Sequence, residues 1–402
     1  MIKKIIPIGL LVVGTLGCSE ENEKPQTEAE EFEGIGVLIS DAESQDLHWY
    51  NHHHQSQETF TSKHAKSRIY RTGTGRYAAI IHRDENLVEY FDSGLELHGN
   101  HVDELRESGV GPMIGEGAKP THFKSSHDLL LAFNDEDGTL LMADEADISE
   151  NGAKMTVLDV GLIPHHGAMA IFDNGNIAVT KKTGDIEGSL PEQVQIIDQT
   201  GALTHEAKIT TNGIHGNASD GNHAVFGSAS GILVVNQDGT QKLIDHPDSF
   251  GDSWFGSILS TQFEGVFVGY TSDHGVYLIN VDSETISPLF TYSGLFRCAM
   301  DVNGSHVLIL LETGMLHVFD VFDQTETASG TVISAFEKPS GGHGAIYPSI
   351  AASSRYVYIT DPDNGQLVIA NLQNLQNIEK VSVSSKPYSL GLVGHESEVG
   401  LH

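Results

Sequence analysis

The stretch that decides the fold runs from His166 to Gly239 and contains the same short pattern twice. The first copy reads His166-Gly-Ala-Met-Ala-Ile-Phe172, a turn Asp-Asn-Gly-Asn176, Ile177-Ala-Val-Thr180 and then Val194-Gln-Ile-Ile-Asp198. The second copy reads Ile214-His215-Gly-Asn-Ala218, a turn Asp220-Gly-Asn222, His223-Ala-Val-Phe-Gly227 and then Ile232-Leu-Val-Val-Asn236. Short β-branched and aromatic runs between Gly, Asn and Asp turns indicate antiparallel strands, and their repetition indicates one structural unit per copy.

The same unit extends over the chain in both directions. The residues that open the first strand of each unit fall near Arg76, His122, His166, His215, Phe255, Phe296, Gly344 and Tyr388. A spacing of 40 to 49 residues suits a propeller blade of four strands. We therefore predict an all-β protein with one eight-bladed β-propeller domain over residues 34–402, with seven blades as the alternative.

The two ends of this domain complement each other. Only 14 residues follow Tyr388, enough for about two strands. At the other end, 35–41 and 47–51 match the third and fourth strands of a unit. Pairing of N-terminal with C-terminal strands would close the ring and leave no open sheet edge between the chain ends.

Composition excludes one class of partner. The 402 residues include 22 Lys plus Arg and 55 Asp plus Glu, a formal net charge of −33. Such a surface repels a phosphate backbone, so we expect no nucleic-acid partner. Histidine is the unusual residue, because its 22 copies equal the whole Lys plus Arg count.

The first residues have the features of an export signal. Met1-Ile-Lys-Lys4 is followed by an apolar run to Leu16 and by Gly17-Cys18. We interpret residues 1–17 as a signal peptide, Cys18 as the lipidated N-terminus of a lipoprotein, and residues 18–33 as an acidic tether. This predicts a periplasmic protein anchored by its lipid alone, in the outer membrane because Ser19 follows the cysteine.

The histidines gather at one phase of the repeat. The first strand of every blade lines the central channel, so residues at the unit openings converge on one axis. Four of these histidines are His122, His165, His166 and His215, and neutral imidazole is a common zinc ligand. A zinc site is therefore predicted in the channel, with its ligands drawn from the set His98, His101, Asp103, His122, His165, His166, His215 and His343.

A second group of histidines lies near the N-terminal strands. His52, His53 and His54 are consecutive, with His48 and His64 nearby. Short His-rich tracts collect metal ions loosely. We interpret residues 48–64 as a mobile His-rich loop that forms a secondary metal site.

The sequence contains no local catalytic motif of a serine hydrolase, zinc protease, phosphate-binding loop or dinucleotide fold. A zinc-binding protein without catalytic residues is therefore the leading hypothesis. The alternatives are a metal-dependent propeller hydrolase and an interaction scaffold with structural histidines. Copper and nickel also accept sets of imidazoles, so the residues alone do not choose the metal.

Several landmarks together resemble one family. They are Leu97-His98-Gly-Asn-His101-Val-Asp103, Lys119-Pro-Thr-His122-Phe123, Pro164-His165-His166-Gly-Ala-Met-Ala170, Gly213-Ile-His215-Gly-Asn-Ala218 and Tyr347-Pro-Ser-Ile-Ala351. In this order, over about residues 34–391, they resemble the periplasmic zinc metallochaperones of the AztD type. The chain departs from that family at Asn212 and Ser228, where members often have cysteines.

The resemblance implies a function. Members of the family are β-propellers that hold zinc and deliver it to the solute-binding protein of a zinc ABC importer, and many carry a flexible His-rich segment near the N-terminus. By this resemblance we expect a zinc-binding metallochaperone with that solute-binding protein as its partner. We expect the protein to be a monomer.

Overall fold

A computed structural model of the 402-residue chain describes residues 34–98, 101–338 and 344–396. Within these ranges the chain forms strands and three short 3-10 helices, at Arg83–Glu85, Glu145–Ser149 and Asp248–Phe250. No helix in the described ranges has the length and apolar character needed to cross a membrane.

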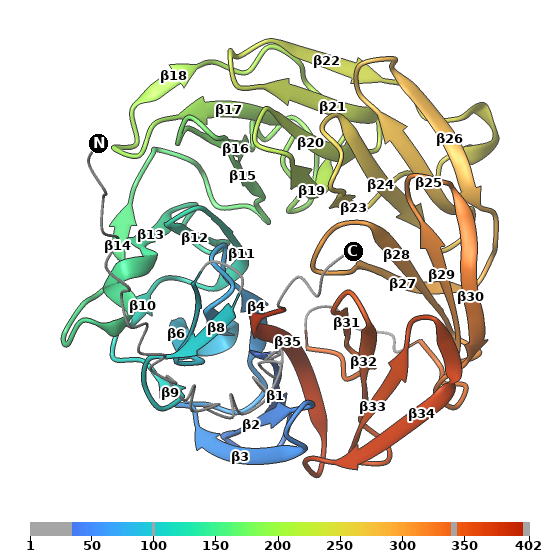
Figure 1. Ribbon diagram of the computed structural model, residues 1–402. Helices are drawn as coiled ribbons and strands as arrows, with labels where there is room; N and C mark the ends of the chain where they lie inside the picture. The colour runs from blue at the N-terminus through green and yellow to red at the C-terminus, as the bar shows by residue number, and fades with distance from the viewer. Residues whose placement is uncertain (1–33, 99–100, 339–343, 397–402) are drawn as a thin grey trace, which may run out of the picture.

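Eight antiparallel sheets stand around a central axis, which confirms the predicted eight-bladed β-propeller (Figure 1). The innermost strands are β4 (Arg68–Arg71), β11 (Pro120–Ser126), β15 (Met169–Ile171), β19 (Ile214–Ser219), β23 (Ser257–Ser260), β27 (Leu295–Met300), β31 (Ile350–Ala352) and β35 (Pro387–His395). The second strands are β5 (Tyr77–His82), β12 (Leu129–Asn134), β16 (Ile177–Lys181), β20 (His223–Ser228), β24 (Val266–Thr271), β28 (His306–Leu311), β32 (Tyr356–Asp361) and β1 (Gly34–Asp41).

The outer half of each blade follows the same order. The third strands are β6 (Leu87–Asp92), β13 (Leu140–Asp144), β17 (Gln193–Ile197), β21 (Gly231–Asn236), β25 (Gly275–Asn280), β29 (Met315–Asp320), β33 (Gln366–Asn371) and β2 (Asp46–Asn51). The outermost strands are β9 (Gly109–Val110) with β10 (Gly115–Glu116), β14 (Thr156–Leu158), β18 (Leu203–His205), β22 (Gln241–Ile244), β26 (Thr285–Phe290), β30 (Thr325–Thr331), β34 (Asn374–Ser382) and β3 (Ser56–Thr61). A separate hairpin consists of β7 (Leu95–His98) and β8 (His101–Glu104).

The core lies between neighbouring blades. Strand β5 is buried at all six positions, because blades pack against both faces of its sheet. One apolar cluster joins two neighbouring blades through Leu131 and Phe133 on one side and Met169 and Val179 on the other. The propeller is therefore held together by layers of apolar side chains between blades.

The ring closes through a mixed blade. Strand β35 pairs with β1 over Gly34 to Asp41, and β2 and β3 complete the sheet. Closure by pairing the two chain ends is confirmed, but the division of strands differs from the prediction: one C-terminal strand meets three N-terminal strands. Residues 35–41 and 47–51 thus belong to the second and third strands. The fourth strand was missed because Ser56-Gln-Glu-Thr-Phe-Thr61 is largely exposed and has the composition of a loop.

Two further sequence interpretations need correction. Arg76 precedes the second strand of its blade, because the four-residue strand β4 is the innermost one and was too short to recognise. The predicted mobile loop over residues 48–64 is also wrong in its extent. His48 lies within β2, His52 to His54 form the turn that joins β2 to β3, and only the last residues of the range follow β3.

Neighbouring innermost strands run in the same direction along the channel. The Ser219 Oγ donates to the Ile171 carbonyl (3.2 Å) and the Ser260 Oγ to the Ser219 carbonyl (2.8 Å). The ring therefore has two distinct faces. We call the face at which the innermost strands begin the start face, and the face at which they end the end face.

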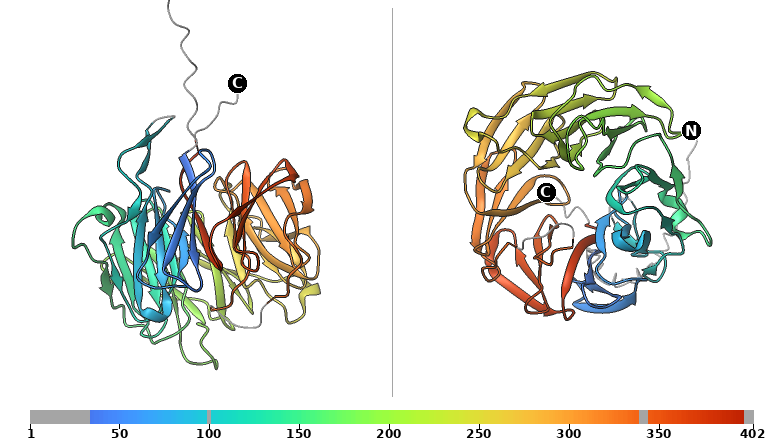
Figure 2. Two further views of the ribbon diagram at one scale, coloured as in Figure 1. Left: turned by 90° about the horizontal axis from the view of Figure 1, so that it is seen from below. Right: turned by 180° about the vertical axis from the view of Figure 1, so that it is seen from behind.

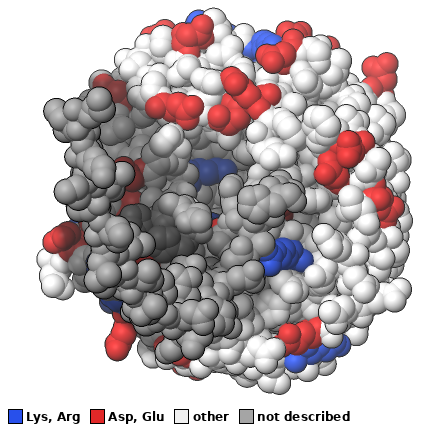
Figure 3. All heavy atoms as spheres, in the orientation of Figure 1, with Lys and Arg blue, Asp and Glu red and all other residues white. Residues whose placement is uncertain are grey.

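The turn between β2 and β3 and the hairpin of β7 and β8 lie at the end face. There Gly34 pairs with His395 at the last residue of β35, and a Cβ on Gly34 would meet Val102 of the hairpin. Figure 2 shows both hairpins projecting to the same side. In the view of Figure 3, carboxylates are spread around the rim of the ring, while some cationic side chains lie at the central opening.

Candidate metal centre

Three imidazoles meet at the start face. His122 lies near the beginning of β11, His166 precedes β15, and His215 is the second residue of β19. Their ring centroids are 4.7 Å (His122 to His166), 5.2 Å (His166 to His215) and 6.2 Å (His122 to His215) apart. Three consecutive blades thus each contribute one histidine from the equivalent position, as the phase of the repeat predicted.

Hydrogen bonds at the far side of two rings fix which nitrogens face the centre. The His215 Nδ1 lies 2.8 Å from the Gly256 carbonyl oxygen, which can only accept, so Nδ1 carries the proton and donates. The His166 Nδ1 lies 2.8 Å from the Asp135 Oδ2. When both rings are neutral, the proton lies on Nδ1 and the Nε2 atom of each ring carries a lone pair, the form in which imidazole binds metals.

Asp135 is itself held in place. Its Oδ1 accepts from the Gly167 backbone N–H (3.4 Å), and its Oδ2 lies 3.5 Å from the Arg83 Nη2. Burial is the largest single effect and would raise the pKa of Asp135, but the hydrogen bonds with His166 and Thr121 and the charges of His166 and His122 together outweigh it, and the pKa is lowered. The carboxylate is therefore charged at neutral pH and can orient the His166 ring. A carboxylate behind a metal-binding histidine also increases the basicity of that ligand.

The spacing of the rings fits a zinc ion. With Zn–N bonds of about 2.0–2.1 Å in tetrahedral geometry, two ligand nitrogens lie roughly 3.3 Å apart and two ring centroids roughly 5 Å apart. The His122 and His166 Nε2 atoms are 3.1 Å apart. Among the described residues no three His, Cys, Asp or Glu side chains already form a complete metal-binding group. Binding would therefore need a small adjustment of the three rings, the largest at His215.

Burial adjusts the protonation of the site. Desolvation lowers the pKa of His215, and the neighbouring His166 lowers it further. The neutral ring is thus favoured even below the usual histidine range, so one ligand is ready for a cation at neutral pH.

His165 does not belong to this group, although the sequence placed it there. Its side chain is buried, its Nδ1 lies 2.7 Å from the Ile163 carbonyl, its Nε2 lies 3.0 Å from the Thr180 Oγ1, and its ring packs against Phe133. Successive residues of an extended chain point to opposite sides, so His165 and His166 cannot both face the channel. His165 is a core residue with both nitrogens hydrogen-bonded.

The remaining members of the predicted set lie elsewhere. His98 and His101 are paired across the β7–β8 hairpin, with Asp103 two residues further along β8, and this hairpin lies at the end face. The structure therefore does not bring this hairpin to the three-histidine group. His343 lies outside the described residues.

The N-terminal histidines are spread over two strands and their flanks. His48 is buried, with its Nδ1 3.3 Å from the Thr59 Oγ1, and burial lowers its pKa. The His52 Nδ1 lies 3.3 Å from the Tyr358 Oη, and its Nε2 lies 3.5 Å from Glu379.

The other three members of this set are divided between the turn and the far end of β3. The rings of His53 and His54 lie 5.0 Å apart in the turn, whereas His64 follows β3 and its ring lies 5.3 Å from the ring of His82. The structure thus separates His48 and His64 from the triplet at the end face.

Sequence reasoning missed Asp135 and the Gly256 carbonyl. Asp135 directly follows the second strand of its blade, one position after Asn134, in a run of acidic residues that has the composition of a turn. Nothing in this local pattern shows that the residue reaches His166 in the next blade. The Gly256 carbonyl leaves no trace in a sequence, because any residue supplies one.

The fold and the site define a class of protein: an eight-bladed β-propeller with a three-histidine group at one mouth of its channel. No protein-family model matches the chain. The sequence is similar to that of a curated protein named zinc chaperone AztD, from Citrobacter koseri, with 21% identity over 349 residues that cover 85% of this chain and 82% of that protein. The resemblance seen in the sequence landmarks is thereby confirmed.

Comparison with solved structures also finds AztD. The structure of apo AztD from Citrobacter koseri superposes with a TM-score of 0.79 and 18% identity, covering 91% of this chain and 99% of that one. A second crystal structure of Citrobacter koseri AztD also has a TM-score of 0.79, at 19% identity. The dihydro-heme d1 dehydrogenase NirN is more distant, with a TM-score of 0.57 and 13% identity. At these identities the superpositions establish the eight-bladed fold.

Proposed function

We propose that this protein is a zinc-binding metallochaperone that holds zinc at His122, His166 and His215 and passes it to another protein. The observation that carries the proposal is the arrangement of these rings, with the Nδ1 of His166 on Asp135 and the Nδ1 of His215 on a backbone carbonyl. Similarity to a protein named zinc chaperone supports zinc as the cargo.

The position of the site suits transfer to an acceptor. His166 and His215 line a cavity of about 550 Å³ at the start face, together with Asp135 and Arg83. Because three protein ligands leave a coordination position open, an incoming ligand can bind the ion before the histidines release it. We propose the solute-binding protein of a zinc ABC importer as the acceptor.

The proposal extends to location and to a secondary site. The sequence of residues 1–33, which lie outside the described ranges, supports a signal peptide, lipidation at Cys18 and an acidic tether at the outer membrane. The turn with His52, His53 and His54 supplies two exposed imidazoles, those of His53 and His54, beside the partly buried His52 at the end face, where they would collect zinc loosely.

The test is the zinc stoichiometry and affinity of untagged protein that begins at residue 18. We expect one tight zinc ion in the wild type, and its loss in His166→Ala and in a His122→Ala, His215→Ala double variant. The control is His127→Asn, which removes an exposed histidine whose backbone φ is 51°, a conformation that Asn tolerates. Retention of the tight ion by both ligand variants would refute the site.

Transfer needs its own measurement. Zinc-loaded protein is mixed with a metal-free zinc solute-binding protein in a stopped-flow instrument, and the rate is compared with that of free exchange through a chelating dye. A direct handover gives a rate that rises with acceptor concentration. A rate limited by spontaneous dissociation would show that the protein stores zinc without delivering it to this acceptor.

A further inference from the structure

A second feature of the channel is a cationic cavity at the start face. This cavity has a volume of about 660 Å³ and is lined by residues of several blades, His215 among them. Its charged lining residues are the cations Lys66, Arg68, Arg83 and Arg297 and the acids Asp84 and Glu85. In a protein with a formal net charge of −33, this local excess of positive charge is unexpected.

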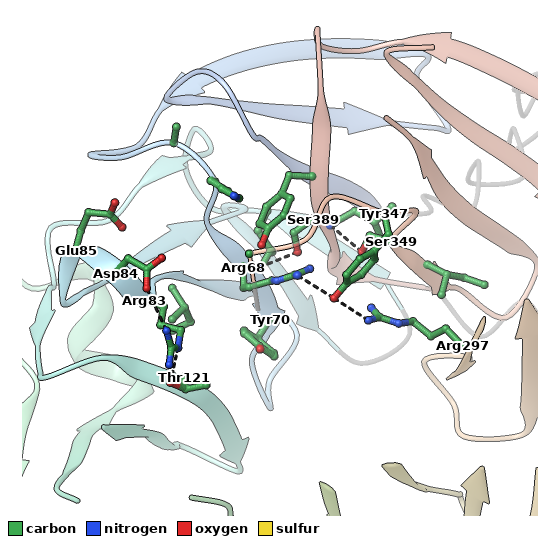
Figure 4. Close-up of a pocket in the computed structure, with 18 of the residues that line it drawn as sticks. Arg68, Tyr70, Arg83, Asp84, Glu85, Thr121, Arg297, Tyr347, Ser349 and Ser389 are labelled. Carbon is green, nitrogen blue, oxygen red and sulfur yellow. Dashed lines mark hydrogen bonds and ion pairs between the residues drawn. The ribbon is translucent and has the colours of Figure 1, made fainter. Parts of the chain in front are cut away.

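Two of these arginines converge on one hydroxyl. The Arg68 Nη2 donates to the Tyr347 Oη over 2.9 Å, and the Arg297 Nη2 donates to the same oxygen over 3.0 Å (Figure 4). Arg68 comes from β4 and Arg297 from β27, in blades that are not adjacent, so the fold alone brings them together. Their two nitrogens cannot be more than about 6 Å apart, since both bind one atom.

Aromatic faces hold both guanidinium groups in position. Arg68 lies 5.0 Å from the ring centroid of Tyr347 and 4.4 Å from that of Tyr388. Arg297 lies 4.7 Å from the centroid of Tyr347 and 5.6 Å from that of Phe296. Stacking of this kind fixes the orientation of a planar guanidinium group.

The charge of Arg297 is not balanced by a carboxylate in the part of the chain that the structure describes. Its electrostatic neighbours there are the tyrosines Tyr347, Tyr270 and Tyr70. The acids of the cavity lie on its other side: Figure 4 shows Asp84 beside Arg83, with 3.1 Å between the Asp84 Oδ1 and the Arg83 Nη1. Burial alone would lower the pKa of Arg297, but these tyrosines raise it above its usual value, so the guanidinium stays charged and can attract an anion.

We propose that this cavity binds a small organic carboxylate, with Arg68 and Arg297 as the residues that hold its carboxylate group. Arginine binds carboxylates through two parallel N–H bonds, and two arginines whose Nη2 atoms lie within about 6 Å of each other suit one carboxylate or two on a short chain. The volume is typical of a small-molecule site and exceeds what an inorganic ion fills. Tyr70 and Ile350 also line the cavity and supply apolar surface for the carbon part of the ligand.

The experiment is isothermal titration calorimetry with succinate as the probe, on metal-free protein, so that its outcome does not depend on the zinc site. Zinc is removed with a neutral phenanthroline chelator, because a polycarboxylate such as EDTA would occupy the proposed site. Succinamide, the uncharged analogue, and inorganic phosphate are titrated at the same ionic strength.

Substitutions identify the groups that bind. Arg297→Gln and Arg68→Gln should each weaken succinate binding roughly ten- to a hundredfold, the effect of losing charge-assisted hydrogen bonds. Arg297→Lys keeps the charge without the planar fork and should lose most of the affinity. The matched control is Arg106→Gln, which removes an exposed arginine that pairs with Asp92 in the blade where β4 is innermost.

Saturable binding of succinate that the two Gln variants lose, and that Arg106→Gln keeps, supports the proposal. A thermal melt of each variant with and without succinate checks the folded state, and a variant that melts as a folded protein but gains no stability from succinate also supports it. The proposal is overturned if succinate does not bind the wild type, if succinamide or phosphate binds as tightly, or if folded Arg297→Gln binds succinate as the wild type does.

Discussion

Asp135→Asn tests whether the hydrogen bond behind His166 strengthens zinc binding. The variant keeps the size of the side chain but removes a full charge 2.8 Å from the His166 Nδ1. Across the imidazole ring, the carboxylate would lie about 7 Å from a zinc ion on Nε2. The Coulomb attraction between them is then about 1 kcal/mol at the dielectric constant of water and about 5 kcal/mol at an effective value near 20.

The expected loss lies in the lower half of that range. The carboxylate is partly neutralised by Arg83, whose Nη2 lies 3.5 Å away. Removing a partner of this kind typically weakens metal binding 10- to 100-fold, or about 1.4–2.7 kcal/mol. We therefore expect Asp135→Asn to weaken zinc binding about tenfold to thirtyfold, while His166→Ala abolishes the tight site.

The assay is competition with a chromophoric zinc chelator at constant pH. Glu136→Gln is the matched control: it makes the same charge change at the next residue, whose side chain is more exposed and pairs with Lys119 over 3.5 Å. The control should bind zinc as the wild type does. Equal affinities of wild type and Asp135→Asn would refute the role of this carboxylate, and equal losses in both variants would show that only the local charge matters.

Three further predictions follow from the same geometry. Zinc affinity should fall steeply between about pH 7 and pH 5, because protons compete with zinc for the imidazoles. The lowered pKa of His215 should displace this fall to lower pH. Zinc titrations at steps of half a pH unit measure the profile, and an affinity that does not change with pH would indicate carboxylate ligands. Replacing His52, His53 and His54 by Ala, or His98 and His101 by Ala, should leave the affinity of the tight zinc site unchanged, because both segments lie at the end face. The triple variant should only load or transfer zinc more slowly in stopped-flow traces. Loss of the tightly bound zinc in either variant would contradict this placement. The metal-free propeller should lose stability as the pH falls from about 6.5 towards 4. Desolvation, aided by the charges of Arg71 and Arg76, lowers the pKa of His395 to about 4, so the unfolded chain binds a proton at this residue before the folded protein does. The free energies of unfolding of wild type and His395→Gln, measured with a denaturant, should differ at neutral pH and converge in acid.

The sequence by itself determined the architecture. Alternating apolar residues and Gly, Asn and Asp turns recur at one spacing, and this local pattern is enough to predict strands, blades and closure by the chain ends. It also determined that His122, His166 and His215 share a phase, since equivalent positions of successive blades face the same channel. These conclusions hold because strand formation and blade repetition depend on residues close together in the chain.

The tertiary structure decided which histidines meet and what supports them. The direction of each side chain reverses with every residue, so His165 entered the core and His166 the channel although they are adjacent. The hairpin with His98 and His101 was placed at the end face by its packing against the closing strands, which no local pattern reveals. Asp135 behind His166, and Arg68 and Arg297 on one tyrosine hydroxyl, are contacts between blades. Such contacts depend on the twist of neighbouring sheets and the width of the channel, which are set only when all eight blades pack together.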